Sequence, residues 1–76
     1  MNRWKPYKHR GFIRRLKRLG FKGPFPGRRH KHMIYGRGFL SIPKYSEYSI
    51  DMLREMISEV EDVIGRKISA DEWNNL

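Results

Sequence analysis

Apolar residues recur at helical spacing in two segments of this 76-residue chain. In the first, residues 9–19, the apolar side chains fall on one side of a helical wheel and basic side chains occupy the rest. These apolar positions are Phe12, Ile13, Leu16 and Leu19. Gly20 follows directly, and glycine commonly ends a helix in the left-handed conformation. The pattern predicts a first helix over 9–19.

The second helical segment is longer and has clearer end signals. Ser49 is a suitable N-cap, Asp51 suits the positive end of a helix, and Gly65 is placed to end it. One apolar stripe runs between them, formed by Ile50, Leu53, Met56 or Ile57, Val60 and Ile64. The spacing predicts a helix that buries this whole stripe.

Between the two helices the pattern changes to short extended segments. Residues 30–35 and 39–42 are expected to be strands joined by a turn at 36–38, where two glycines can supply positive φ. Alternation directs Met33 toward the core and His30 and His32 away from it. Residues 21–25 contain proline and glycine, so they allow only a short edge strand or a loop.

The chain ends allow the fold class to be stated. Ser69-Ala70-Asp71-Glu72 has the form of a capping box, which predicts a short final helical turn holding Trp73 against the body. Residues 1–8 show no periodicity and are expected to be a basic arm, pinned by Trp4. The order predicts an α+β fold, a small two-layer sandwich over a single domain of residues 9–76.

Charge is divided unevenly along the chain and indicates an anionic partner. The net charge is +9, and residues 1–38 hold thirteen Lys or Arg and no Asp or Glu. This composition leaves open RNA, DNA, a membrane surface or an acidic protein. The first helix could lie on an anionic membrane, but the fold needs its narrow apolar stripe for the core, which favours a phosphate backbone. We therefore expect no membrane association.

The small size and the composition of the chain restrict the kinds of site and the classes of protein that are possible. A chain this short cannot enclose both a core and a deep pocket, so a shallow site for a polymer is expected. The absence of cysteine excludes disulfides and thiolate metal sites. No apolar run approaches the length of a signal peptide or a membrane span, so the sequence predicts a soluble, cytoplasmic protein.

His30 is the first candidate for chemistry. RNA is cut without metal when a base takes the 2′-hydroxyl proton, an acid protonates the leaving 5′-oxygen, and cations hold the phosphorane charge. An imidazole suits the proton transfers because its pKa lies near neutrality. The cations would come from Arg28, Arg29 and Lys31. The alternative is that His30 only hydrogen-bonds backbone or phosphate.

The sequence gives weaker indications of function for several other polar and aromatic residues. His32, on the same strand face, is expected to contact phosphate or to be exposed, with a role as complementary acid as the alternative. A metal site built from the histidines is not expected, because the surrounding charge opposes a dication, and no cofactor is predicted. Trp4, Tyr7, Tyr45 and Tyr48 could stack on bases or pack in the fold. Further phosphate contacts are expected from Arg14, Arg15, Lys17, Arg18 and Lys44.

An ordered set of short motifs resembles the HicA family of mRNA interferase toxins, also called the YcfA-like family. The set begins with Gly27-Arg28-Arg29-His30-Lys31-His32-Met33 and Leu40-Ser41-Ile42-Pro43. It continues with Ser49-Ile50-Asp51-Met52-Leu53-Arg54 and Ile68-Ser69-Ala70-Asp71-Glu72-Trp73. The resemblance covers about Phe12 to Trp73. This chain has Arg29 where many members have Ser or Lys, Tyr45 where many have a second histidine, and a longer last helix.

The resemblance implies an α-β-β-β-α fold like that of double-stranded-RNA-binding domains, with its first strand at 21–25. It also implies metal-independent endoribonuclease activity on single-stranded RNA, with His30 as the essential histidine and Gly27 as the backbone turn at the site. A HicB-type antitoxin would be the partner. The alternative function is a non-catalytic RNA-binding module of the same fold, and a third is a structural piece of a ribonucleoprotein or a partner-protein adaptor.

Overall fold

The computed structural model describes residues 3–76 as a helix, a three-stranded sheet and two further helices. The elements in chain order are β1 (Tyr7–Lys8), α1 (His9–Leu19), β2 (Lys22–Phe25), β3 (Lys31–Tyr35), β4 (Gly38–Ile42), β5 (Glu47–Tyr48), α2 (Ile50–Ile64) and α3 (Ala70–Asn74). The predicted α-β-β-β-α order is confirmed by α1, β2, β3, β4 and α2, and the predicted last helical turn by α3.

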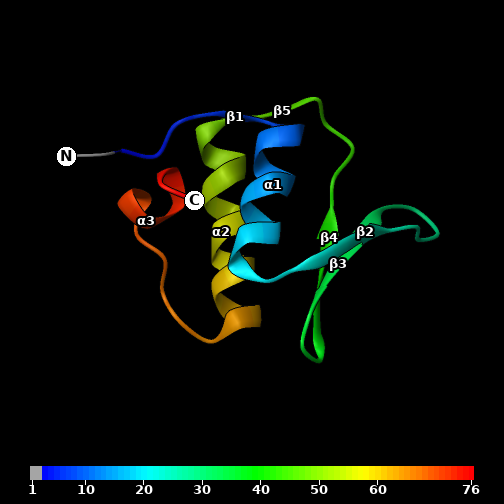
Figure 1. Cartoon of the computed structure of the whole chain (residues 1–76). Coiled ribbons are helices and arrows are strands. Elements are labelled where there is room, and N and C mark those ends of the chain that lie inside the picture. Colours follow the sequence, from blue (N-terminus) through cyan, green and yellow to red (C-terminus); the bar gives the residue numbers. More distant parts are fainter. Residues whose placement is uncertain (1–2) are drawn as a thin grey trace.

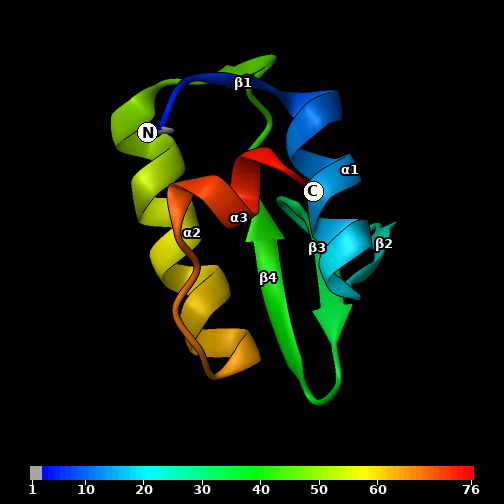
Figure 2. The same ribbon diagram turned by 60° about the vertical axis from the view of Figure 1, so that its left-hand side comes forward.

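The main sheet has the strand order β2-β3-β4 and is antiparallel throughout. A tight turn joins β3 to β4, and Gly36 has the positive φ of 57° that such a turn requires. The pairing of β2 with β3 shifts in register between Lys22 and Phe25, where β2 contains Gly23 and Pro24. Figures 1 and 2 show both long helices on the same side of this sheet, which leaves its other face uncovered.

The first helix forms as its sequence pattern predicts. Phe12 and Leu16 are fully buried in the core, while Arg14, Lys17 and Arg18 face solvent. Gly20 ends the helix with φ of 115°, and its N–H donates to backbone carbonyls of the last turn. The apolar stripe thus holds α1 under β2 and leaves its cationic side free.

The second helix differs from prediction at its first residue. Ser49 caps it, with Oγ accepting from the N–H of Met52, and Gly65 ends it at φ 80°. Most of the predicted stripe is buried, but Ile50 is 42% exposed. The first turn of α2 lies beside the β1–β5 ribbon and not over the main sheet (Figure 1). Including Ile50 in the core was therefore wrong.

The N-terminal segment is tied to the other end of the chain. Tyr7 is buried, pairs with Tyr48 across the β1–β5 ribbon, and its hydroxyl donates to Oδ1 of Asn74. Trp4 packs against the core, as predicted. The expected arm of residues 1–8 is thus joined to the domain through β1, while Met1 and Asn2 lie outside the described residues.

Trp73 closes the core on the side of the helices away from the sheet, where α3 lies in Figure 1. Its indole is 0% exposed, with ring centroids 5.4 Å from Phe12 and 6.2 Å from Tyr7. Ser69 Oγ accepts from the N–H of Glu72, which is half of the predicted capping box. The Glu72 carboxylate pairs instead with Arg66, and this exposed pair holds the pKa of Glu72 below its usual value.

No helix formed by residues 3–76 combines the length and the apolar character needed to cross a bilayer.

Candidate nucleic-acid interface

His30 lies in the bend of residues 28–30 that connects β2 to β3. The sequence placed it at the start of a strand, but β3 begins one residue later, at Lys31. The side chain is exposed, and its imidazole has no hydrogen-bond partner among residues 3–76. Both ring nitrogens are therefore open to a ligand. Arg28 and Arg29 are exposed beside it in the same bend.

Gly27 shapes the bend through a close backbone approach. A Cβ added at Gly27 would lie 2.3 Å from the carbonyl oxygen of His30 and 3.5 Å from Nδ1 of His32. The first distance is far below van der Waals contact, so no other residue fits without movement of the backbone. This approach bends the chain before β3 and explains why His30 does not belong to the strand.

Replacing Gly27 with alanine is expected to displace this bend and to destabilise the fold by about 1–3 kcal/mol through overpacking. Gly11→Ala is the matched control, because its Cβ would make ordinary contacts of 3.5 Å with Arg15 and 3.8 Å with Tyr7. Alanine is favoured over glycine in a helix, so the control should gain up to about 1 kcal/mol. Urea unfolding gives both values. Parent-like stability and unchanged His30 and His32 NMR shifts in Gly27→Ala would contradict the assignment.

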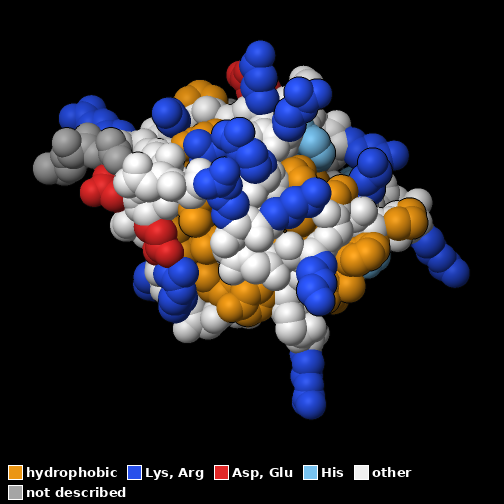
Figure 3. All heavy atoms as spheres, viewed as in Figure 1, with side chains coloured by type: hydrophobic (Ala, Val, Ile, Leu, Met, Phe, Trp, Pro, Cys, Tyr) orange, Lys and Arg blue, Asp and Glu red, His pale blue; other side chains and the backbone are white. Residues whose placement is uncertain are grey.

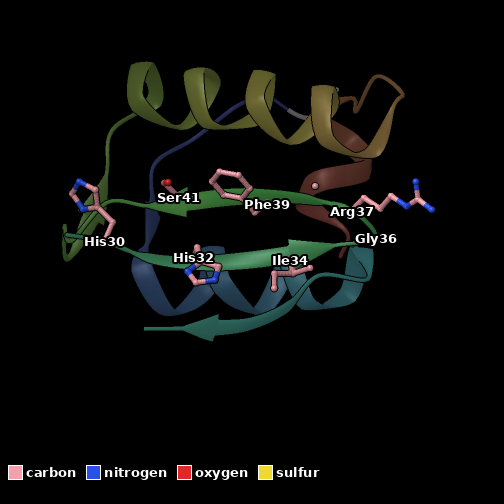
Figure 4. Close-up of a pocket in the computed structure, with 8 residues that line it drawn as sticks. His30, His32, Ile34, Gly36, Arg37, Phe39 and Ser41 are labelled. Carbon is pink, nitrogen blue, oxygen red and sulfur yellow. The ribbon is translucent and has the colours of Figure 1, made fainter. Parts of the chain in front are cut away.

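The uncovered sheet face carries a shallow hollow of about 520 Å³, here called the open-face hollow. Figure 4 shows His32, Ile34 and Phe39 projecting from the strands on this side, with His30 and Arg37 at opposite ends. Met33 is fully buried on the opposite side. The predicted alternation along β3 is therefore confirmed for His32, Ile34 and Met33.

A second hollow of about 640 Å³, the α2 hollow, lies on the other side of His30. Here His30 meets Lys44 and Tyr45, which follow β4 and are distant from it in sequence. Glu55 and Glu59 of α2 line the same hollow. These two carboxylates did not figure in the sequence analysis, because only the packing of α2 on the sheet brings them near the basic bend.

A third hollow of about 430 Å³, the His9 hollow, continues from there. Lys44 and Tyr45 line it as well, together with Lys31 and with His9 at the start of α1. A fourth, the α1 hollow of about 480 Å³, is lined by His9 and by Arg14, Lys17 and Pro24 among others. Neighbouring hollows thus share lining residues, and they follow one another from the open sheet face to the basic side of α1.

The tautomer of His9 follows from its hydrogen bonds. The Tyr48 hydroxyl lies 2.8 Å from the carbonyl oxygen of Pro43, which can only accept, so the single hydroxyl proton points there. His9 Nδ1 lies 2.9 Å from the same hydroxyl and must therefore donate to it. The proton sits on Nδ1, and Nε2 of this half-buried ring stays available to a ligand.

The buried hydroxyl of Tyr48 is expected to make the fold less stable in alkali. Burial raises the pKa of Tyr48 to about 12 from an ordinary 10.0. As the pH rises, the Tyr48 hydroxyl loses its proton in the unfolded chain before it does so in the folded protein. The contribution of Tyr48 to the free energy of unfolding is therefore complete below about pH 10 and is lost as the pH rises toward 12. In this window the free energy of unfolding should fall by about 1.4 kcal/mol per pH unit. Urea unfolding at several alkaline pH values measures this slope.

The comparison of two tyrosine variants isolates this effect. Tyr48→Phe should show a shallower alkaline slope, although it is less stable at neutral pH because it loses two hydrogen bonds. Tyr45→Phe should keep the parent slope, since Tyr45 is 56% exposed. Equal slopes in the parent and in Tyr48→Phe would show that another group causes the alkaline loss.

The predicted cations of α1 divide into two groups. Arg14 and Lys17 line the α1 hollow and Arg18 is exposed. In Figure 3 the Lys and Arg side chains crowd the face over α1. Arg15 differs, because its Nε donates to the Trp73 carbonyl oxygen at 3.1 Å and its guanidinium lies 4.4 Å from the centroid of the Tyr7 ring. Arg15 therefore joins α1 to α3, and its predicted contact with phosphate stays a prediction.

The structure distinguishes between the two alternatives left open for four aromatic residues, stacking on bases or packing in the fold. Tyr7 and Tyr48 are buried and Trp4 is half-buried, which leaves Tyr45 exposed. The exposed rings that the sequence analysis missed are Phe39, at 65%, and Phe25, at 40%. The available signal was alternation: with Leu40 and Ile42 facing the core, Phe39 must face solvent.

Within residues 3–76, His, Asp and Glu side chains form no group of three that could hold a metal ion. Comparisons with protein-family models, with curated proteins and with solved structures give no match to this chain.

Proposed function

We propose that this protein is an RNA-binding endoribonuclease that cuts single-stranded RNA without a metal ion, with His30 as the proton-transfer residue. The observation that carries the proposal is the position of His30. Its unpartnered imidazole stands between two hollows on a surface rich in cations, beside Arg28, Arg29 and Lys31. A polymer strand that crosses from one hollow to the other passes this ring.

The chemistry needs only groups that are present on this surface. A ring nitrogen of His30 takes the proton of a ribose 2′-hydroxyl, and the freed oxygen attacks the adjacent phosphorus. The bond from phosphorus to the 5′-oxygen then breaks, and that oxygen receives a proton from the imidazolium or from water. The products are a 2′,3′-cyclic phosphate and a 5′-hydroxyl. Arg28 and Arg29 stabilise the charge that develops on the phosphate oxygens.

The remaining predicted cations would bind the strand on either side of the cleaved linkage. Lys44 and Lys31 line the hollows next to His30, and Arg14 and Lys17 line the hollow over α1. Together with Arg18 they would supply affinity that does not depend on base sequence. His32, on the open sheet face, would contact the strand next to His30.

The test is incubation of the purified protein with long single-stranded RNA in EDTA, followed by analysis of the new ends. We expect cuts that carry 2′,3′-cyclic phosphates and 5′-hydroxyls. A requirement for added metal, or ends that carry 5′-phosphates, would reject this mechanism.

Salt dependence tests the electrostatic part separately. With about five phosphate contacts to single-stranded RNA, the logarithm of the binding constant should fall with the logarithm of salt concentration at a slope of about −3.5. Filter binding or fluorescence anisotropy across a salt series measures this slope. A binding constant that does not change with salt would contradict a phosphate-based interface.

The second candidate is a non-catalytic RNA-binding module with the same fold. It is favoured by the residues around His30, because Tyr45 and not a second imidazole shares the α2 hollow with it. Tight RNA binding without cleavage in the EDTA assay would favour this alternative.

The resemblance to HicA toxins motivates two further expectations. A HicB-like antitoxin would inhibit the protein by covering His30, and the pair would act in the cytoplasm, where mRNA is available. Purification of the protein co-expressed with its neighbouring open reading frame, followed by the same cleavage assay, tests for such an inhibitor.

A further inference from the structure

The uncovered sheet face carries three rings on three neighbouring strands. Phe25 of β2 is the register partner of His32 of β3, with ring centroids 5.9 Å apart. Phe39 of β4 lies on the other side of His32, at 6.4 Å in an edge-on arrangement. We call these three residues the aromatic face. Figure 4 shows His32 and Phe39 projecting from the side of the sheet opposite the helices.

The fold does not use this face for its own core. Phe39 is 65% exposed and Phe25 is 40% exposed, whereas Met33 and Leu40 on the opposite side of the same strands are buried. Isolated exposed apolar residues are common on protein surfaces. Two phenylalanines flanking an imidazole on one continuous surface are instead a patch that suits a flat, apolar ligand.

Charge around the aromatic face indicates what kind of ligand this is. The first acidic residue of the chain is Glu47, so β2, β3, β4 and their connections contain none. Arg37 lines one end of the open-face hollow and His30 the other, separated by the length of β3, roughly 16 Å. A ligand here meets rings in the middle, Arg37 at one end, and at the other end His30 beside the cationic bend of Arg28 and Arg29. That combination matches the bases and phosphates of a nucleic-acid strand.

We propose that the aromatic face stacks unpaired nucleobases of the RNA strand whose phosphates pass Arg37 and His30. This deepens the proposed function, on which it rests, by making single-stranded RNA with accessible bases the substrate class. Only an unstacked base offers its flat face to a side chain, so a duplex cannot use these rings. Stacking tolerates any base, because all four have a π face.

The experiment compares two strands of 2′-O-methyl RNA, which lack the 2′-hydroxyl and cannot be cut by this route. One carries bases throughout, and the other has equal length and charge but contains abasic positions. Binding of both is measured by anisotropy for the parent, Phe39→Ala, Phe39→Leu and Phe39→Trp. Ile50→Ala is the matched control, since Ile50 is an exposed apolar residue on α2, outside the four hollows.

Phe39→Ala should weaken binding of the strand with bases by about 5- to 150-fold, the range for loss of one base–aromatic stack. Phe39→Leu should lose a similar factor, because it keeps an apolar side chain but no ring. Phe39→Trp should retain parent affinity, and Ile50→Ala should match the parent. Binding of the abasic strand should be weaker in the parent and unaffected by Phe39→Ala.

Two results overturn the inference in distinguishable ways. If the parent binds both strands equally and Phe39→Ala changes neither, RNA binding stands but the aromatic face has another occupant, such as a protein partner. If the parent binds neither strand, both this inference and the proposed function are rejected. Phe39 is largely exposed, so its variants should fold, which circular dichroism verifies.

Discussion

Replacing His30 with alanine should lower the rate of RNA cleavage by about 10²- to 10⁴-fold, the contribution expected of one general acid or base. Binding should be largely retained, because the cations of the neighbouring bend and of α1 remain. The fold should also be retained, since the exposed imidazole has no hydrogen-bond partner among residues 3–76. Single-turnover cleavage of labelled single-stranded RNA, with anisotropy for binding, separates the two effects.

His30→Arg is the informative comparison, because arginine can hold phosphate but cannot exchange protons near neutral pH. If His30 acts in proton transfer, His30→Arg should be as inactive as His30→Ala. If His30 only holds phosphate, His30→Arg should cut like the parent. An active His30→Arg variant would therefore reject the assignment while leaving RNA binding by this surface intact.

Replacing Trp73 with alanine should unfold the protein or bring it close to unfolding. Truncation of a fully buried tryptophan costs about 3–5 kcal/mol, and a domain this small has a margin of only a few kcal/mol. The indole packs on Phe12 of α1 and on Tyr7 of β1. Its loss therefore loosens β1, α1 and α3 together. Urea unfolding followed by circular dichroism measures the effect.

Trp73→Phe refines this prediction. The indole N–H of Trp73 is buried without a hydrogen-bond partner among the described residues, so phenylalanine keeps most of the packing and removes an unsatisfied donor. It should be clearly more stable than Trp73→Ala. Phe39→Ala is the surface control, because Phe39 is 65% exposed. If Trp73→Ala unfolds at the same urea concentration as the parent, the proposed closure of the core by α3 is wrong.

The helices were predictable because their signals are local. The apolar spacing of residues 9–19 and the residues at both ends of α2 act within a few positions of one another, so the sequence contains what is needed to place them. The same holds for the turn at Gly36 and the inward direction of Met33. The predictions were wrong where the end of a helix or strand depends on contacts with a distant part of the chain or on a close backbone approach, as at Ile50 and at the start of β3.

The candidate site was only partly predictable for a related reason. The cluster from Gly27 to His32 is contiguous in sequence, so its charge and its imidazoles could be recognised directly. The meeting of His30 with Tyr45 and Glu55 could not, because it depends on how α2 packs on the sheet. Arg15 shows the converse, since only the docking of α3 reveals that its guanidinium is already engaged.

The sequence by itself determined the order of α1, β3, β4, α2 and α3, the accumulation of positive charge in the first half and the identity of the candidate imidazole. Each of these depends on neighbouring residues or on simple composition. The tertiary structure alone decided which face of the sheet stays uncovered, and therefore that Phe25 and Phe39 remain exposed beside His32. Both helices carry an apolar stripe, and burying both against one side of three strands leaves no element to cover the other.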